Sequence, residues 1–187
     1  METPDHHVVF GAEIDFEFVY RVRGQAPQDT ATLPVPVVVT TPGGSAMSTV
    51  ALAQVAPSFI LLDAKHVAGI ILRSDASGAF GGGTYVIIGP TGTSLGYQPV
   101  AAKAGDSVVI FAVGFGPTKT AVPPGAPYTG SAATTNTVNV LINNVSVTPA
   151  CSGETSAGLY QLNLTIPPGL GVGIRHMWFP DVRASLR

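Results

Sequence analysis

Charged side chains are scarce in this sequence, and their scarcity excludes several kinds of protein. Aspartate, glutamate, lysine and arginine make up 11% of the 187 residues, whereas about a quarter is usual in soluble proteins. Coiled coils, helical bundles with solvated faces and charge-rich disordered tails all need more charge. The 9 lysines and arginines are scattered and the net charge is −2. The sequence therefore lacks the basic cluster typical of nucleic-acid binders, and we expect no nucleic-acid partner.

Cysteine occurs once, as Cys151. A single cysteine excludes an internal disulfide and any metal site built from a cysteine cluster. A catalytic thiol needs a partner histidine, and no spacing in the chain identifies one. We therefore predict that Cys151 is a small residue beside a strand, and we expect no metal and no cofactor.

Long apolar runs are also missing, since no stretch approaches the roughly 20 residues of a membrane span. The opening "METPDHHVVF" is acidic and broken by proline, unlike a signal peptide. We expect no membrane span, and either a cytoplasmic chain or a piece of a longer exported protein.

Glycine and proline are abundant instead, at 22 and 16 residues, together with many valines and threonines. This composition predicts short strands joined by turns. Charges nearly vanish after Leu33, so we place a boundary there. The N-terminal segment 1–33 contains one expected strand, "AEIDFEFVY", and a polar linker. Residues 34–173 form the predicted β-sandwich, and 174–187 an atypical C-terminal tail.

Three patterns define the sandwich. Val108 to Phe115 is apolar on both faces, which predicts a central strand covered on both sides. "GLYQLNLTIPPG" alternates, with Tyr160, Leu162, Leu164 and Ile166 facing inward. "TVNVLINNVSV" predicts a hairpin with Asn143-Asn144 as its turn, because asparagine tolerates positive φ. With a hairpin over 37–55 and short strands near residues 58–62, 66–73 and 85–89, we count eight or nine strands. An all-β, antiparallel sandwich without helices accounts for them.

The glycine pair in "VVIFAVGFGPTKT" suggests a phosphate-binding loop, but its spacing does not fit. A Walker loop places glycine directly before lysine, and here Thr118 precedes Lys119. Prolines follow where a phosphate loop must open a helix. We predict a central strand that ends in a glycine bend, with Lys119 in a solvated loop.

Two further groups of residues are candidates for function. His66 lies near Asp63, which allows a hydrolase site if a serine lies near, although no G-x-S-x-G elbow is present. Tyr97, Tyr128 and Trp178 are candidate ligand-binding aromatics, since loop aromatics bind sugars and loops often carry binding residues. An exposed, coplanar pair among these three would favour carbohydrate binding.

Three ordered stretches carry a family resemblance: "VVVTTPGGSAMSTVALAQVAPSFILLD", "QPVAAKAGDSVVIFAVGFGPTKTAVPPG" and "VNVLINNVSVTPACSGETSAGLYQLNLTIPPGLGVG". Together they resemble the uncharacterised Solibacter-type C-terminal domain of acidobacterial secreted proteins, over roughly residues 36–173. The resemblance implies an immunoglobulin-like, TIG-related β-sandwich at the end of an exported or cell-surface protein, and it carries over no catalytic residue. It also implies that residues 34–57 are the closing strands of a preceding unit.

The tail "IRHMWFPDVRASLR" departs from the closing strand of that family, and an open edge strand is a site of self-association. Our first hypothesis is a non-enzymatic structural or adhesion module, extracellular or at the cell surface. Its partners are then other domains of a larger exported protein, an extracellular partner or a glycan. The alternatives are a carbohydrate-binding module that uses the loop aromatics and a hydrolase around His66 and Asp63.

Overall fold

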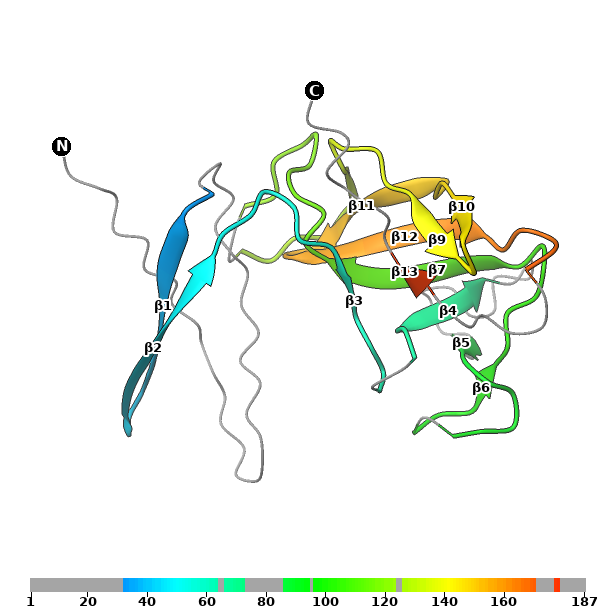
Figure 1. Cartoon of the computed structure of the whole chain (residues 1–187), viewed down its shortest axis with the longest axis horizontal. Coiled ribbons are helices and arrows are strands. Elements are labelled where there is room, and N and C mark those ends of the chain that lie inside the picture. The colour runs from blue at the N-terminus through cyan, green and yellow to red at the C-terminus, as the bar shows by residue number, and fades with distance from the viewer. Residues whose placement is uncertain are drawn as a thin grey trace.

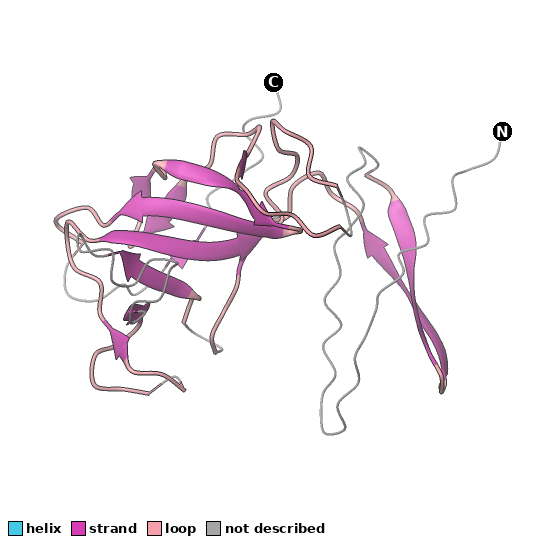
Figure 2. Cartoon of the chain, turned by 180° about the vertical axis from the view of Figure 1, so that it is seen from behind, coloured by secondary structure: helices cyan, strands magenta, loops and turns pink. Residues whose placement is uncertain are grey.

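The computed structural model describes residues 32–63, 66–72, 86–94, 96–123, 126–170 and 177–178. Every regular element in these ranges is a strand, so the predicted all-β class is confirmed (Figure 2). Most of the N-terminal segment, including its expected strand, and most of the C-terminal tail lie outside the described residues. Within those ranges no helix is long and apolar enough to cross a membrane.

The described chain contains thirteen strands. In chain order they are β1 (Pro34–Thr41), β2 (Gly44–Ala51), β3 (Ser58–Phe59), β4 (Gly69–Leu72), β5 (Val86–Ile88), β6 (Pro99–Val100), β7 (Ser107–Val113), β8 (Ala132–Ala133), β9 (Val140–Ile142), β10 (Val145–Val147), β11 (Cys151–Ser156), β12 (Leu159–Thr165) and β13 (Met177–Trp178).

The strands form three groups (Figure 1). The large sheet has the order β6-β5-β4-β7-β12-β11-β8, and β3 also pairs with β7. The small sheet has the order β10-β9-β13. The third group is the β1–β2 hairpin, which stands beside the two sheets and is joined to them by residues 52–57 (Figures 1 and 2).

Strand β7 lies in the middle of the large sheet, as its apolar pattern predicts. It pairs with β12 along one edge, and with β4 and β3 along the other. Val108 and Ile110 are fully buried on one face, and Val109 is buried on the other. A strand covered on both faces needs apolar side chains at successive positions, which is what this stretch supplies.

The core lies between the large sheet and β9. Val140 and Ile142 of β9 are completely buried and belong to one cluster with β4, β5, β7 and β12. Its members from β12 are the alternate residues Tyr160, Leu162 and Leu164, continued by Ile166, so the predicted inward face of this strand is confirmed. Two sheets in contact through a shared apolar core are consistent with a β-sandwich.

Both predicted hairpins form. The β9–β10 hairpin turns at Asn143 and Asn144, whose φ angles are +48° and +65°. Two positive φ values give the turn a twist that matches the flanking strands. The β1–β2 hairpin also forms, but its return strand is Gly44–Ala51 rather than residues 48–55.

The prediction of a wholly antiparallel sandwich with eight or nine strands is wrong in two respects. β5 and β6 pair in parallel, because the chain from Gly89 to Gln98 crosses over before it rejoins the sheet. The additional strands are short or polar: β6, β8 and β13 have two residues each, and β11 reads "CSGETS". Polar, small residues carry little hydrophobic periodicity, so β11 gives no strand signal.

The glycines of "GFGPTKT" bend the chain at the end of β7. Gly114 has φ +79° and Gly116 has φ +80°, and both lie against the segment that leads into β3. The amide of Ala56 donates a hydrogen bond to the Gly114 carbonyl (2.9 Å). A Cβ at Gly114 would lie 2.1 Å from the Ala56 carbonyl oxygen. The predicted glycine bend is therefore confirmed.

We predict that Gly114→Ala lowers the free energy of unfolding by about 3 kcal/mol or more, because positive φ strain adds to a clash with backbone. Gly92→Ala is the matched control, since Gly92 has φ +85° but open space around its Cα. The control should lose about 1 kcal/mol. Urea unfolding measures both, and equal losses in the two variants would contradict the role of the Ala56 contact.

Candidate functional site

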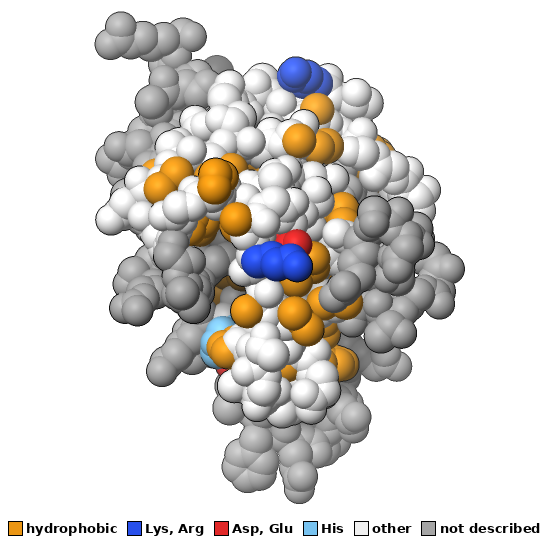
Figure 3. Space-filling model, turned by 90° about the vertical axis from the view of Figure 1, so that its right-hand side faces the viewer, with side chains coloured by type: hydrophobic (Ala, Val, Ile, Leu, Met, Phe, Trp, Pro, Cys, Tyr) orange, Lys and Arg blue, Asp and Glu red, His pale blue; other side chains and the backbone are white. Residues whose placement is uncertain are grey.

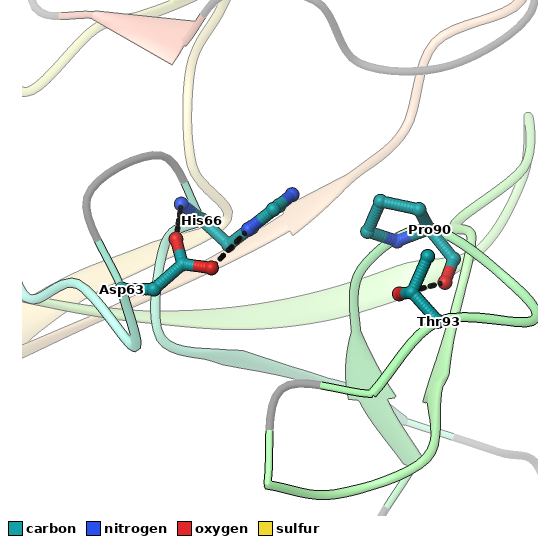
Figure 4. Close-up of polar contacts among 4 residues, drawn as sticks. All are labelled: Asp63, His66, Pro90 and Thr93. Carbon is teal, nitrogen blue, oxygen red and sulfur yellow. Dashed lines mark hydrogen bonds and ion pairs between the residues drawn. The ribbon is translucent and has the colours of Figure 1, made fainter.

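Asp63 and His66 lie together in a turn before β4 (Figure 4). One carboxylate oxygen of Asp63 accepts the backbone N–H of His66 (2.8 Å), and the other lies 2.7 Å from the ring Nδ1. The amide of Leu62 donates to the His66 carbonyl (2.8 Å) and closes the same turn. The carboxylate therefore stabilises the local backbone as well as orienting the imidazole.

A hydrolase would need a hydroxyl nucleophile on the other ring nitrogen, Nε2. Within the part of the chain that the structure describes, the hydrogen bond of the His66 ring goes to Asp63. Both side chains are partly solvent-exposed, at 30% and 41%. The predicted proximity of the two residues is confirmed. The Thr93 hydroxyl, drawn in the same view, donates to the Pro90 carbonyl (2.7 Å) (Figure 4).

The three predicted aromatic residues lie on different elements. Tyr97 is 62% exposed in the loop between β5 and β6. Tyr128 is half-buried in the loop before β8, with its hydroxyl close to Gly130. Trp178 belongs to β13 and pairs with Leu141 of the small sheet. Tyr97 is thus the aromatic that the described surface presents most openly.

A polar hollow of about 320 Å³ lies beside β8 and the start of β11. Its polar lining includes Lys119, Thr134, Asn136, Thr148, Cys151 and Ser152. This hollow was not predicted from the sequence, because its walls come from three separate segments. They meet through the pairing of β11 with β8 and through contacts of the Lys119 segment with residues 133–134.

The hydroxyl groups of this hollow are used within the fold. Thr134 Oγ1 donates to the Asn136 carbonyl (2.9 Å) and lies 2.8 Å from Ser152 Oγ. Because a hydroxyl has one proton, Ser152 is the donor in that second bond. Thr148 Oγ1 donates to Asn139 Oδ1 (2.8 Å). The lining is neutral apart from Lys119, and no base among these groups is placed to activate a nucleophile.

Lys119 occupies an exposed loop, as predicted. Its backbone amide donates to the Ala133 carbonyl (2.8 Å), and Thr118 forms a bridge with Thr134. No helix follows in the described residues after Lys119, so its surroundings do not form a phosphate-binding loop.

The surface around these groups is weakly charged. On the face drawn in Figure 3, charged side chains are few among apolar and uncharged ones, and one cationic side chain lies against an acidic one. Among the described residues no three acidic, histidine or cysteine side chains gather closely enough to hold a metal. Cys151 is an exposed, free thiol on β11.

Glu154 of β11 is the charged residue that sequence reasoning missed. It is 1% exposed, and its Oε1 accepts the backbone N–H of Gly158 (2.7 Å) in the turn between β11 and β12. Burial raises the pKa of this carboxyl, and the Gly158 hydrogen bond opposes the rise. Its burial could not be predicted, because "CSGETS" shows no strand pattern in the sequence.

Tyr160 lies directly across the ladder from Glu154. Burial, and secondly the charge of Glu154, raises the pKa of Tyr160 to about 12. The Tyr160 hydroxyl donates to the Gly116 carbonyl, and its ring lies 5.5 Å from that of Phe115. Perturbed pKa values can mark an active site. Here both groups are buried and hydrogen-bonded to backbone, so they hold the β11–β12 turn and the glycine bend.

No protein-family model, curated protein or solved structure matches this chain. The resemblance to the Solibacter-type domain therefore stays a prediction that rests on the three sequence stretches.

We predict that Glu154→Gln alters how stability depends on pH. The folded carboxyl binds its proton at higher pH than the unfolded one, whose pKa is near 4.5. Wild-type stability therefore gains a contribution as pH falls from neutral through the raised pKa towards 4.5. Glutamine keeps the acceptor for Gly158 and lacks this proton, so the variant is favoured most at neutral pH. Thermal unfolding from pH 4.5 to 8 checks this, and parallel curves would refute it.

Proposed function

We propose that this chain is a non-catalytic, immunoglobulin-like β-sandwich module that serves as a structural spacer or adhesion unit of an exported or cell-surface protein. The observation that carries the proposal is that its polar side chains form hydrogen bonds within the fold. The Asp63 carboxylate closes a turn, the Thr134–Ser152 pair joins β8 to β11, and Glu154 holds the β11–β12 turn. Groups committed to the backbone serve stability rather than turnover.

The immunoglobulin-like assignment and the exported location have separate support. Antiparallel pairing through β4-β7-β12-β11 and a core shared with β9 agree with the sandwich that the family resemblance implies. The resemblance also supports the end of an exported multidomain protein as the setting. Neighbouring domains of such a protein are the partners that this proposal predicts.

The hydrolase alternative is favoured by the 2.7 Å contact between Asp63 and His66. We predict that the protein hydrolyses p-nitrophenyl acetate no faster than its His66→Ala variant, because among the described residues the hydrogen bond of the ring goes to Asp63 and not to a hydroxyl. Initial rates over pH 6–9 measure this, with circular dichroism as the check on folding. A wild-type rate that falls in both His66→Ala and Asp63→Asn would replace the spacer function with catalysis.

Carbohydrate binding is the second candidate function, and the exposure of Tyr97 favours it. An aromatic ring open to solvent gives a sugar an apolar face to stack on, and the hydroxyl can accept or donate a hydrogen bond. The Tyr97 loop is also tethered. Thr93 bonds to the Pro90 carbonyl, and the Ala101 amide donates to Thr91 Oγ1 (3.0 Å).

For a spacer, we predict no retention on a glycan array. Tyr97→Ala and Leu61→Ala are the matched variants, since both remove an exposed large side chain. Retention of a glycan by wild type and by Leu61→Ala, with loss of about tenfold or more in Tyr97→Ala, would put the carbohydrate function first.

A further inference from the structure

The β1–β2 hairpin pairs with no other described strand. Every residue of β2 is exposed, and Met47 reaches 72%. An isolated two-stranded ribbon is marginally stable in water and gains stability when strands are added to it. A further strand could be added at the outer edge of β1 or at the outer edge of β2.

One hydrogen bond next to the hairpin ladder shows which residue pairs are hydrogen-bonded. The Leu52 amide donates to the Leu33 carbonyl (3.2 Å), directly beyond the first strand pair. Bonded and non-bonded pairs alternate in antiparallel ladders. The odd-numbered residues of β1 therefore bond to β2, and its even-numbered residues direct their backbone groups outward. Two of these are Pro34 and Pro36, which have no N–H, so the outer edge of β1 is blocked.

No described strand pairs with the outer edge of β2. By the same alternation, its outward backbone groups belong to Ser45, Met47, Thr49 and Ala51. This edge contains no proline, and residues 32–62 contain no charged side chain. Natural edge strands are usually protected by charge, by proline or by a covering segment. Among the described residues, β1 has such protection and β2 has none.

We propose that two copies of this chain associate through β2, paired antiparallel about a two-fold axis at Ser48. The four-stranded sheet has the order β1-β2-β2-β1. In this register all four outward residues are used: Ser45 meets Ala51 of the second copy, and Met47 meets Thr49. No other antiparallel register pairs all four, because a shift by one residue turns bonded positions away from the partner.

The chemistry of the edge fits a second copy. Self-pairing about a two-fold axis brings two copies of the same strand together, so a charged strand would face like charges on its copy, and this strand has no charge. Small Ser48 side chains face each other on the axis, where the strands come closest. The prolines of β1 form both outer edges of the new sheet. Pairing therefore closes at two copies and does not extend into a fibre.

A proline scan of the two edges tests the proposal. Thr49→Pro removes an outward N–H of β2 without breaking the hairpin ladder, and Val38→Pro makes the same change on β1. Wild type and Val38→Pro should sediment as dimers, at twice the 19.1 kDa of one chain. Thr49→Pro should weaken dimerisation by about tenfold or more. A monomeric wild type up to its solubility limit, or a fully dimeric Thr49→Pro, would overturn the proposal.

A charge pair tests the axis and covers the case in which both proline variants are monomeric. Ser48→Lys and Ser48→Glu each place like charges opposite one another, and each should weaken dimerisation roughly fivefold. An equimolar mixture of the two should recover dimers, detected by sedimentation velocity. Recovery of dimers in the mixture supports pairing at Ser48. If the mixture stays monomeric and both proline variants are also monomeric, pairing at Ser48 is rejected. A peptide or unrelated protein on this edge would give dimers in none of these samples.

Discussion

The two-sided burial of β7 is the constraint on which the rest of the structure depends. A strand that is apolar on both faces must be covered on both faces and paired along both edges. β12 and β4 supply the edges, and β9 covers one face with Val140 and Ile142. The two glycines that end β7 then let the chain before β3 pass close to its backbone. The bend at these glycines therefore contacts both the segment before β3 and the hydroxyl of the buried Tyr160.

Several polar side chains of the described residues form hydrogen bonds at points where strand pairing ends or is interrupted. Glu154 lies at the irregularity between β11 and β12, Thr134 lies just after β8, and Asp63 lies in the turn before β4. Each supplies an acceptor or donor to backbone that has no strand partner. A protein with 11% charged residues has few charged groups available, and two of the described ones, Asp63 and Glu154, lie at these points. This distribution favours a module whose function lies at its surface and edges.

Long alternating stretches were predictable from the sequence, and contacts between distant segments were not. The continuous apolar run of β7 and the alternation of β12 each predict a strand, and the tolerance of asparagine for positive φ predicts the Asn143-Asn144 turn. These are local properties of the sequence. β11 was missed because its two buried residues, Gly153 and Glu154, carry no apolar signal. The hollow at Thr134 and Ser152 requires β8 to pair with β11, and the parallel β5–β6 pair requires a crossover. Of the candidate site, the Asp63–His66 contact was predictable from its spacing of three, and Glu154 was not.

The attachment of the hairpin has a mechanical consequence. A pulling force applied N-terminal to the sandwich reaches it at Ala56, whose amide is bonded to Gly114, and then at β3. The β3–β7 ladder contains two residue pairs, whereas the β7–β12 ladder contains six. Under load the chain would therefore peel from β7 through Phe59 before the central ladder is strained. The segment from 52 to 59 would act as an extensible leader that absorbs a pull while the core stays folded.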